Sequence, residues 1–383
     1  MSSAFTRRSL SLLAAGLLSL TTVSVTPGVA SAEYDTFARQ TWSPNNTVYS
    51  ITQHGDRIYI GGKFSRLQNT STGQWANQAR IAAFDATTGD LITSFNPQIG
   101  SGEVRGIDVS ADGSRIYIGG YFSNVNGASR DNLAAVDPAG NLVPGWDAST
   151  NKRVKDVVRV GDDLYIGGVF NRLNNQRRIG LGKISAADGS IENWVADTIG
   201  GRPRAVFASP NGNDLIVAGS FDLLDGQPRP FLGSVGLSSG DVTSWLPEAH
   251  CSECDLFDVV ADGDGVYGAV GGPGGYGIKW SATTGQIQWW LRGDGNAQAI
   301  DVFEDIVYVG GHFGPSFAGE RRTNIAAINA TTGQLLPWAP DLGPRYYPGV
   351  WAIHAGPDFL RLGGGFRSVD GVNQARYAEL PYI

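Results

Sequence analysis

A short phrase ending in Gly-Gly-x-Phe recurs along this chain, and it restricts the possible folds more strongly than any other feature. The first copy, Ile58-Tyr-Ile-Gly-Gly-Lys-Phe64, is followed by similar ones at 116–122 and 164–170. The seven copies begin at Ile58, Ile116, Leu164, Leu215, Val266, Val307 and Leu360, and the fifth is degraded. Their spacing of roughly fifty residues is typical of β-propellers, in which each repeat folds into one blade.

Each repeat also contains the pattern of four short β-strands. An alternating strand such as Val104–Val109 precedes the Gly-Gly phrase, which is itself the second strand. A strand of small residues such as Leu133–Asp137 follows, and after a Gly-containing turn comes a last strand with an aromatic residue such as Trp146. One such sheet cannot bury both of its faces, so neighbouring sheets must stack on it. The sequence therefore predicts an all-β fold, a seven-bladed β-propeller with four-stranded blades.

The two ends of the repeat array predict how the ring closes. The seventh unit stops after its third strand, at Arg376-Tyr-Ala-Glu-Leu380. The missing fourth strand has a counterpart at the other end of the chain, because Phe37–Trp42 resembles the blade-ending segments. We therefore expect the N-terminal strand to complete the last blade, which would leave few sheet edges exposed.

The repeats resemble those of the secreted bacterial propellers with Gly-Gly-x-Phe repeats, the delta-60 or quinoprotein-like propeller group. Asp85-Ala-Thr-Thr-Gly89 and its copies are also similar to part of the tryptophan-docking repeat of quinoproteins. The resemblance covers residues 34–383 and implies the propeller fold, but the group spans many functions. Quinoprotein enzymes usually have eight blades rather than seven, and this sequence shows no clear metal-site constellation. We therefore expect no quinone or other cofactor.

The first 32 residues have the pattern of an export signal. Arg7-Arg8 supplies the positive start, Leu10–Leu20 is a short apolar run, and Ala30-Ser31-Ala32 fits a signal-peptidase site. The context of Arg7-Arg8 is similar to a twin-arginine signal, although an ordinary secretory signal has the same features. We expect residues 1–32 to be a signal peptide and residues 33–383 to form a single β-propeller domain that is secreted and extracellular.

Charge and cysteine content narrow the possible partners. Without Arg7 and Arg8 the chain has 27 basic and 36 acidic residues, a net charge of −9, which argues against nucleic acid as a partner. No later apolar stretch is long enough for a membrane span. Cys251 and Cys254 are the only cysteines, and in an exported protein we expect a disulfide between them. A metal site with His250 is the less favoured alternative, since no second Cys-x-x-Cys completes it.

Long, dissimilar connections are predicted on one rim of the ring, whereas the opposite rim carries short repeated turns. Variable loops on a rigid scaffold are where binding residues concentrate. The aromatic residues of this rim that fall outside the repeat are Trp75, Tyr276, Tyr346, Tyr347 and Trp351. Of these, Trp75, Tyr346, Tyr347 and Trp351 are predicted to bind a ligand, because the first and seventh units are neighbours in a closed ring and exposed aromatics suit sugars and protein hot spots. The alternative is that they pack the loops against the blades.

Basic residues form a second candidate group. Arg105 and Arg204, with Lys155, stand at the starts of innermost strands and could form a ring of anion-binding groups at the channel mouth. Another set precedes the third strand of six units, at Arg80, Arg130, Arg178, Arg229, Arg322 and Arg376. Because that set repeats in nearly every unit, a structural role with carboxylates or backbone carbonyls is the favoured interpretation.

The sequence lacks the common catalytic motifs, including the Gly-x-Ser-x-Gly elbow, the His-Glu-x-x-His pair and the phosphate-binding loop. We therefore predict a non-catalytic binding or assembly module that recognises an extracellular protein or a cell-surface glycan, as part of a larger secreted assembly. The alternative is an enzyme, either a carbohydrate-active hydrolase or lyase, or a quinone-dependent oxidoreductase. Carboxylates from different blades could form a hydrolase pair, and the sequence alone cannot pair them.

Overall fold

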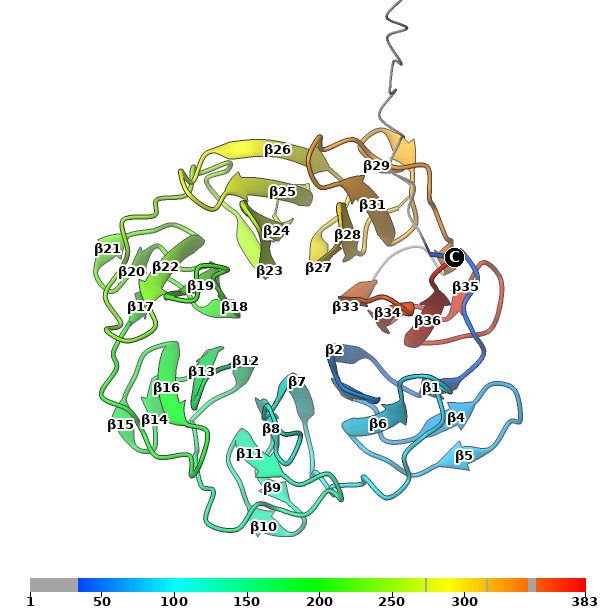
Figure 1. Cartoon of the computed structure of the whole chain (residues 1–383), viewed down its shortest axis with the longest axis horizontal. Coiled ribbons are helices and arrows are strands. Elements are labelled where there is room, and N and C mark those ends of the chain that lie inside the picture. Colours follow the sequence, from blue (N-terminus) through cyan, green and yellow to red (C-terminus); the bar gives the residue numbers. More distant parts are fainter. Residues whose placement is uncertain (1–33, 273, 315, 344–348) are drawn as a thin grey trace, which may run out of the picture.

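The structure is a computed structural model, and it describes residues 34–272, 274–314, 316–343 and 349–383. These residues are all-β and contain no helix. Seven radial sheets are arranged in a ring, and each begins with a strand at the centre of the ring (Figure 1). We call the space that these innermost strands enclose the channel. The sheets are β2 (Val48–His54), β3 (Arg57–Gly62) and β6 (Ile81–Asp85); β7 (Glu103–Val109), β8 (Ile116–Tyr121) and β11 (Leu133–Val136); β12 (Val154–Val160), β13 (Asp163–Gly168) and β16 (Leu181–Ser185); β18 (Pro203–Ala208), β19 (Asp214–Gly219) and β22 (Leu232–Gly236); β23 (Asp255–Asp262), β24 (Gly265–Gly271), β25 (Tyr276–Ser281) and β26 (Ile287–Arg292); β27 (Ala297–Phe303), β28 (Ile306–Gly311) and β31 (Ile325–Asn329); and β33 (Val350–Ala355), β34 (Phe359–Gly364) and β36 (Tyr377–Pro381).

Short strands in the connections form small sheets of their own, nearer the outside of the ring (Figure 1). They are β1 (Trp42–Pro44), β4 (Leu67–Asn69) and β5 (Trp75–Ala76); β9 (Asn124–Val125) and β10 (Ala128–Ser129); β14 (Arg172–Leu173) and β15 (Gln176–Arg177); β17 (Thr198–Ile199), β20 (Leu223–Leu224) and β21 (Gln227–Pro228); β29 (Ser316–Phe317) and β30 (Glu320–Arg321); and β32 (Leu342–Gly343) and β35 (Ser368–Val369).

The prediction of four strands in every unit is wrong for most of the described sheets, since only β23–β26 has four. In five other units the expected fourth strand is a single bridge, as between Phe84 and Leu91 or Val136 and Leu142. The chain turns directly afterwards, because the Ile92 carbonyl accepts a hydrogen bond from the amide of Phe95 (3.1 Å). The aromatic side chain at this turn is fully buried in the core.

The Gly-Gly repeat has a steric cause. A Cβ on the first glycine, such as Gly61, would lie 2.7 Å from a methyl of Val104 in the next sheet. A Cβ on the second glycine, such as Gly120, would lie 2.1 Å from the Glu103 carbonyl oxygen of its own sheet. The first glycine therefore lets neighbouring sheets approach, and the second lets an inner-strand carbonyl turn towards the second strand. Six of the seven units show this second contact in the described residues.

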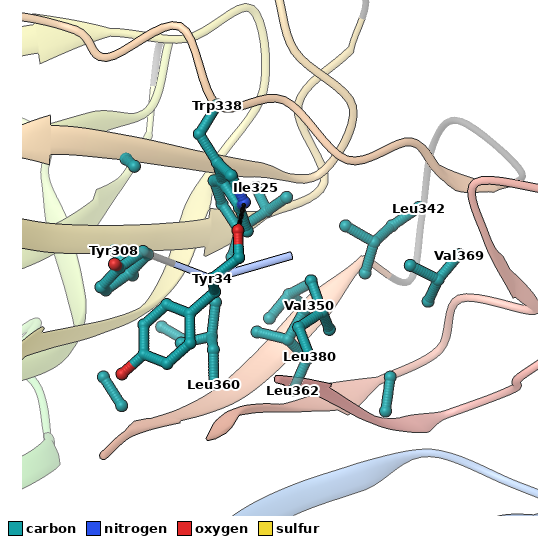
Figure 2. Close-up of a cluster of buried hydrophobic side chains, with 14 of the residues drawn as sticks. Tyr34, Tyr308, Ile325, Trp338, Leu342, Val350, Leu360, Leu362, Val369 and Leu380 are labelled. Carbon is teal, nitrogen blue, oxygen red and sulfur yellow. Dashed lines mark hydrogen bonds between the residues drawn. The ribbon is translucent and has the colours of Figure 1, made fainter. Parts of the chain in front are cut away.

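The hydrophobic core lies between neighbouring sheets rather than in one centre. A representative cluster combines Tyr117 and Leu133 of the second sheet with Val154 and Leu164 of the third. The cluster between the sixth and seventh sheets includes Tyr34 near the N-terminus, whose carbonyl accepts a hydrogen bond from Trp338 Nε1 (2.8 Å; Figure 2). Each sheet thus buries its faces only through its two neighbours, as expected for a repeat architecture.

The N-terminal segment lies along the edge of the last sheet, beside β36. Single antiparallel bridges join Tyr34 to Tyr382 and Arg39 to Glu379. Arg39 lies within the predicted segment Phe37–Trp42, whereas Tyr34 precedes it. Within that segment Phe37 is 57% exposed, and Trp42 belongs to β1, which pairs with β4. The predicted signal peptide, residues 1–32, lies outside the described residues. Within the described residues no helix is long and apolar enough to cross a membrane.

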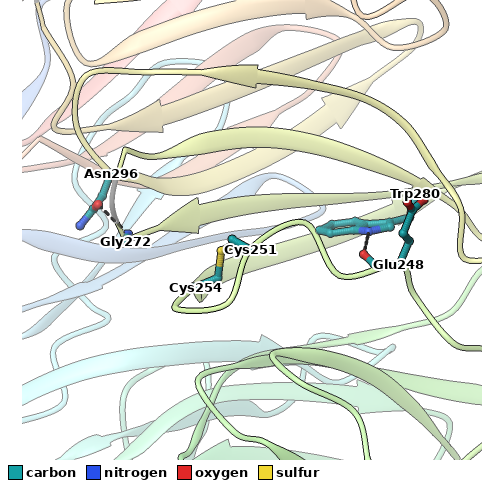
Figure 3. Close-up of a disulfide and its surroundings, with 6 residues drawn as sticks. All are labelled: Glu248, Cys251, Cys254, Gly272, Trp280 and Asn296. Atoms are coloured by element: carbon teal, nitrogen blue, oxygen red, sulfur yellow. Dashed lines mark hydrogen bonds between the residues drawn. A yellow bond between two sulfur atoms is a disulfide. The ribbon is translucent and has the colours of Figure 1, made fainter.

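Cys251 and Cys254 lie at disulfide-bonding distance, with their Cα atoms 5.8 Å apart, in the connection that leads into β23 (Figure 3). Trp280 fixes the same connection, because its Nε1 donates a hydrogen bond to the Glu248 carbonyl (3.0 Å). The irregular segment around His250 is thus a loop that the cysteine pair holds on one side and the Trp280 hydrogen bond on the other.

Candidate ligand site at the channel mouth

Each innermost strand contains a β-bulge at the same place. Opposite the Gly-Gly pair, the pairing register skips one residue, which has no partner on the second strand. Bulges re-aim side chains and are common next to functional sites. The seven skipped residues, which we call the bulge ring, are Tyr49, Arg105, Lys155, Arg204, Phe257, Gln298 and Trp351.

All seven residues of the bulge ring line one cavity of about 280 Å³ within the channel. The bulges lie near the beginning of each inner strand, where the second strand also ends and the connection to the third strand leaves. The cavity is therefore at the end of the channel that carries the long connections. Its size is at the lower limit of small-molecule sites, so it suits one small chemical group rather than an extended ligand.

One side of the bulge ring is basic. Arg105, Lys155 and Arg204 come from the neighbouring strands β7, β12 and β18. Arg105 Nε pairs with the Glu103 carboxylate at 2.7 Å, and Arg204 pairs with Asp255. Both guanidinium groups also lie over aromatic rings, with Arg105 3.7 Å from the Tyr49 centroid and Arg204 4.4 Å from that of Phe257. These contacts fix the two arginines in place, which reduces the entropy lost on binding an anion.

Lys155 lies between the two arginines and has no ion-pair partner among the described residues. Burial, together with the positive charges of Arg105, Arg153 and Arg204, lowers the pKa of Lys155 to about 7, while the Glu103 carboxylate acts in the opposite direction. An ammonium group in this position lacks a counter-ion. A ligand carboxylate would therefore stabilise its charged form.

The other side of the bulge ring is aromatic. Trp351 packs edge-on against Tyr49 and Phe257, with both pairs of ring centroids 5.9 Å apart. These three rings come from β2, β23 and β33, and the Gln298 side chain from β27 lines the cavity between Phe257 and Trp351 in ring order. A cationic wall thus faces an aromatic wall across a small cavity.

Three polar atoms of residues on this second side lack a hydrogen-bond partner within the described part of the chain. They are Trp351 Nε1, Gln298 Oε1 and Ser50 Oγ, and Ser50 directly follows the bulged Tyr49. Gln298 is 3% exposed. Buried polar groups in native proteins nearly always have a partner, and leaving one unpaired costs about 1–3 kcal/mol. Trp351 and Gln298 are bulged residues that line the same cavity, so partners for their two atoms would come from its contents. Ser50 Oγ instead lies against the second strand, 2.4 Å from the position that a Cβ on Gly61 would take.

Two buried carboxylates lie directly after bulged residues, and both are occupied by the backbone. Asp156 accepts the amides of Val157 and Val206 (both 2.9 Å), and Asp258 accepts the amide of Ile300 (3.0 Å) from the next sheet. Burial raises the pKa of Asp156 to about 8 and that of Asp258 to about 6. These carboxylates join neighbouring inner strands. Across the described ranges, no group of three or more His, Cys, Asp or Glu side chains could hold a metal ion.

The structure brings together only part of the predicted site. Arg105, Arg204 and Trp351 line the same cavity, together with Lys155. Trp75 lies on β5 near the outside of the ring, 48% exposed and covered by Arg66, so it does not converge with Trp351 (Figure 1). Tyr346 and Tyr347 lie outside the described residues.

Sequence reasoning missed three members of the bulge ring, which are Tyr49, Phe257 and Gln298. The Gly-Gly repeat held the signal that could have found them, because the second glycine marks where the inner strand bulges. Tyr276, the remaining rim aromatic, packs against His250 and Trp290 instead, with ring centroids 4.9 and 5.6 Å away.

The arginines that precede the third strands have structural contacts, as favoured above. Arg178 donates to the Trp194 carbonyl (2.9 Å), and Arg229 donates to that of Thr243 (2.9 Å). Arg322 donates to the Leu336 carbonyl (2.6 Å). In each case the acceptor lies in the segment that leads to the blade-ending aromatic of the same unit. For these three arginines, backbone support is the role that the structure shows.

Comparisons with known proteins agree with this architecture. Residues 111–142, which include β8 and β11, match a family described as a β-propeller domain of unknown function (DUF5122). No curated protein matches the chain. Among solved structures, the chain is similar to the crystal structure of the computationally designed Ika8 protein, with a TM-score of 0.54 and 12% identity over 91% of this chain and 100% of that one. At this identity the likeness concerns the fold alone. The chain is thus an all-β protein with a β-propeller family match.

Proposed function

We propose that this chain is a secreted, non-catalytic binding protein that holds an anionic group of its partner, a glycan or an extracellular protein, at the mouth of a propeller channel. The observation that carries the proposal is the bulge ring. Seven side chains from equivalent positions converge on one cavity, with Arg105, Lys155 and Arg204 on adjacent strands. Clustered, pre-positioned cations attract and orient anions.

The proposed architecture is a seven-bladed β-propeller whose last blade is completed by the N-terminal segment. The seven radial sheets and the bridges of Tyr34 and Arg39 to the last sheet support it. Membership of the delta-60 or quinoprotein-like group is part of this proposal, on the strength of the repeated Gly-Gly phrase.

Binding is favoured over catalysis by the state of the carboxylates. A glycosidase needs two carboxyl groups free to exchange protons or to attack the sugar. Asp156 and Asp258 accept hydrogen bonds from the backbone, and Glu103 and Asp255 pair with arginines. The loop-rich rim, including Trp75, would add contacts around the mouth for a larger partner.

Calorimetric titration of the mature protein with polygalacturonate, poly-glutamate, dextran sulfate and neutral dextran tests this function. We expect binding to at least one polyanion and none to neutral dextran. Arg204→Gln and Lys155→Met should weaken binding on the order of tenfold each, because each removes a charge-assisted contact. Lys152→Met is the matched control, since Lys152 is exposed and lies outside the bulge ring.

Three outcomes would overturn the proposal. The first is that none of the polyanions binds, and the second is that binding is unchanged in both site variants. The third is turnover: release of reducing ends from the polysaccharides, or dye-linked oxidation after addition of a quinone, would favour the enzymatic alternatives.

A further inference from the structure

We propose that the anionic group held at the channel mouth is a sugar acid, a hexuronate unit of an extracellular glycan. This inference rests on the proposed function and adds the chemical class of the ligand. It rests on the two different walls of the cavity: one wall requires a negative charge on the ligand, and the other requires hydroxyl groups.

The basic wall requires an anion. Arg105, Arg153, Lys155 and Arg204 carry positive charge here, and only Glu103 and Asp255 pair with members of this group among the described residues. Two cations are therefore not neutralised by protein carboxylates. A single ligand carboxylate beside Lys155 would supply the missing partner and could accept from more than one donor.

The opposite wall requires hydroxyl groups. Gln298 Oε1 is an acceptor and needs a donor, whereas Trp351 Nε1 is a donor and needs an acceptor. Sulfate, phosphate at full charge or a simple carboxylate offers acceptors only, so it would leave Gln298 Oε1 unpaired. Sugar hydroxyls both donate and accept, so one sugar ring can satisfy both kinds of atom.

The shape of the cavity agrees with this chemistry. Aromatic rings bind the apolar C–H face of a sugar, and Trp351 supplies such a ring beside the polar atoms. One face of Phe257 is covered by Arg204. The volume of about 280 Å³ accommodates one sugar ring and not a folded peptide segment. A carboxylate on one edge of the ring would reach the basic wall while the hydroxyl groups face Gln298 and Trp351.

Titration of the mature protein with galacturonate and glucuronate, followed by NMR or calorimetry, tests the inference. Glucose removes the carboxylate, glutarate removes the hydroxyl groups, and sulfate is a simple anion. We expect at least one hexuronate to bind on the order of tenfold or more tightly than each of these three probes. Equal affinity for sulfate and hexuronate would show an anion site without sugar recognition and would overturn the inference.

Variants locate the two walls separately. Gln298→Leu and Trp351→Phe should each weaken hexuronate binding on the order of tenfold and leave sulfate binding unchanged. Lys155→Met should weaken both. Trp290→Phe is the matched control for Trp351→Phe, because it removes the same N–H group from an exposed tryptophan outside the cavity. Hexuronate affinity that survives both Gln298→Leu and Trp351→Phe would count against sugar recognition at this wall.

Lowering the pH should strengthen binding in a defined range. Because the free protein has a Lys155 pKa of about 7, in the field of Arg105, Arg153, Arg204 and Glu103, the anion-binding form gains population as the pH falls from 8 to 6. Asp156, Asp258 and Asp301 line the same cavity and also gain protons over this range, which acts in the same direction. Lys155→Met should therefore reduce this dependence rather than remove it. A parent protein whose hexuronate affinity is flat between pH 6 and 8 would show that Lys155 does not contact the carboxylate.

Failure of the inference and failure of the proposed function give different results. Binding of poly-glutamate or dextran sulfate at the bulge ring, without hexuronate binding, would retain the proposed function and overturn the sugar-acid ligand. Absence of binding to every anion would overturn both. A high-resolution structure with ordered water alone on Gln298 and Trp351 at millimolar hexuronate would also overturn the inference.

Discussion

The junction between the last sheet and the first differs from the junctions between other neighbouring sheets. At ordinary junctions a repeated tyrosine of the second strand reaches the next sheet. Tyr117 OH donates to the Ala186 carbonyl (2.9 Å), and Tyr165 OH donates to that of Leu237 (2.7 Å). At the last junction the equivalent position is Arg361, and its Nη2 donates to the Ala86 carbonyl (3.0 Å). An arginine thus makes the bond that a tyrosine makes elsewhere.

The arginine requires further partners that the tyrosine does not. Arg361 and Glu379 have side chains that are 1% and 0% exposed, and Arg361 Nε lies 3.2 Å from the Glu379 carboxylate. Arg361 also donates to Gln53 of the first sheet (2.9 Å), and Arg39 of the N-terminal segment pairs with Glu379. Tyr377 OH donates to the same carboxylate (2.7 Å). The last junction is therefore a buried ionic network that involves three separate parts of the chain.

This difference indicates how a repeat protein can specify which two sheets meet where its ends join. A tyrosine–carbonyl contact fits any two neighbouring units, because every unit offers a similar carbonyl. A buried arginine tolerates only a junction that supplies its carboxylate, since an unpaired buried charge is strongly unfavourable. In this way the network favours pairing of the last sheet with the first sheet and the N-terminal segment.

Deleting residues 34–41 should have the largest effect on stability. The deletion removes the buried Tyr34 side chain, the acceptor of Trp338 Nε1 and the Arg39 partner of Glu379. Summing side-chain burial and a broken buried ion pair gives a loss on the order of 5 kcal/mol. Urea denaturation of the mature protein measures it. Phe37→Ser is the control in the same segment, since that side chain is exposed, and an unchanged urea midpoint in the deletion would contradict the closing role.

Replacing the ionic network with the residues of an ordinary junction tests the comparison directly. Glu379→Ala should cost about 3–5 kcal/mol, because it leaves the buried Arg361 without its carboxylate. Arg361→Tyr should cost less, because Glu379 keeps its ion pair with Arg39. The double variant recreates the pair found at Tyr117 and Ala135, which face each other across β8 and β11. It should recover more than half of the summed loss in chemical denaturation. Strictly additive losses would show that the two residues do not act as a pair.

The carboxylates at ordinary junctions should make stability depend on pH. Burial raises the pKa of Asp156 to about 8, of Asp258 to about 6 and of Asp301 to about 7, above the value of 3.8 taken for the unfolded chain. The folded state therefore holds protons that the unfolded state releases, so stability falls as the pH rises from about 4 to about 8. The slope is at most about 1.4 kcal/mol per pH unit for each group.

Melting curves of the parent and of Asp156→Asn between pH 5 and 8.5 measure this slope. The variant should show a shallower decline, since it removes one of the titrating groups. Asp90→Asn is the control, because Asp90 is exposed in a turn. A parent protein that becomes more stable as the pH rises through this range would contradict the predicted sign.

The smallest effect distinguishes two adjacent tryptophans at an ordinary junction. Trp289 is buried and its Nε1 donates to the Ala330 carbonyl of the next sheet (2.9 Å), whereas Trp290 is 45% exposed. Trp289→Phe should cost about 1–3 kcal/mol, because it leaves that carbonyl without its donor and loses packing. Trp290→Phe should change stability by less than about 0.5 kcal/mol. Equal effects in thermal denaturation would show that the alternation of β26 does not control the junction.

The sequence by itself determined the all-β character and the repeated sheets. The Gly-Gly phrase is detectable because two close contacts, one with the next sheet and one with the inner strand, disfavour a side chain in most of the repeats. Those contacts involve only a repeat and its neighbour, so the glycines recur at regular intervals in the sequence. The prediction of complete fourth strands failed because in five units the chain turns after a single bridge, which sequence periodicity does not reveal.

Only the tertiary structure decided which side chains meet at the channel mouth. Arg105, Arg204 and Trp351 were recognisable as candidates from their sequence positions. Their grouping with Tyr49, Phe257 and Gln298 depends on a backbone bulge, and the bulge forms whatever the type of the bulged residue. Each repeat can place any side chain there, because the bulged residue faces the channel rather than a neighbouring sheet. Trp75 shows the converse, since a long connection gives no periodic constraint on where its side chain lies. The physical reason is that the backbone register of one sheet fixes where its bulged side chain lies, whereas only the arrangement of all the sheets in the ring fixes which other side chains lie next to it.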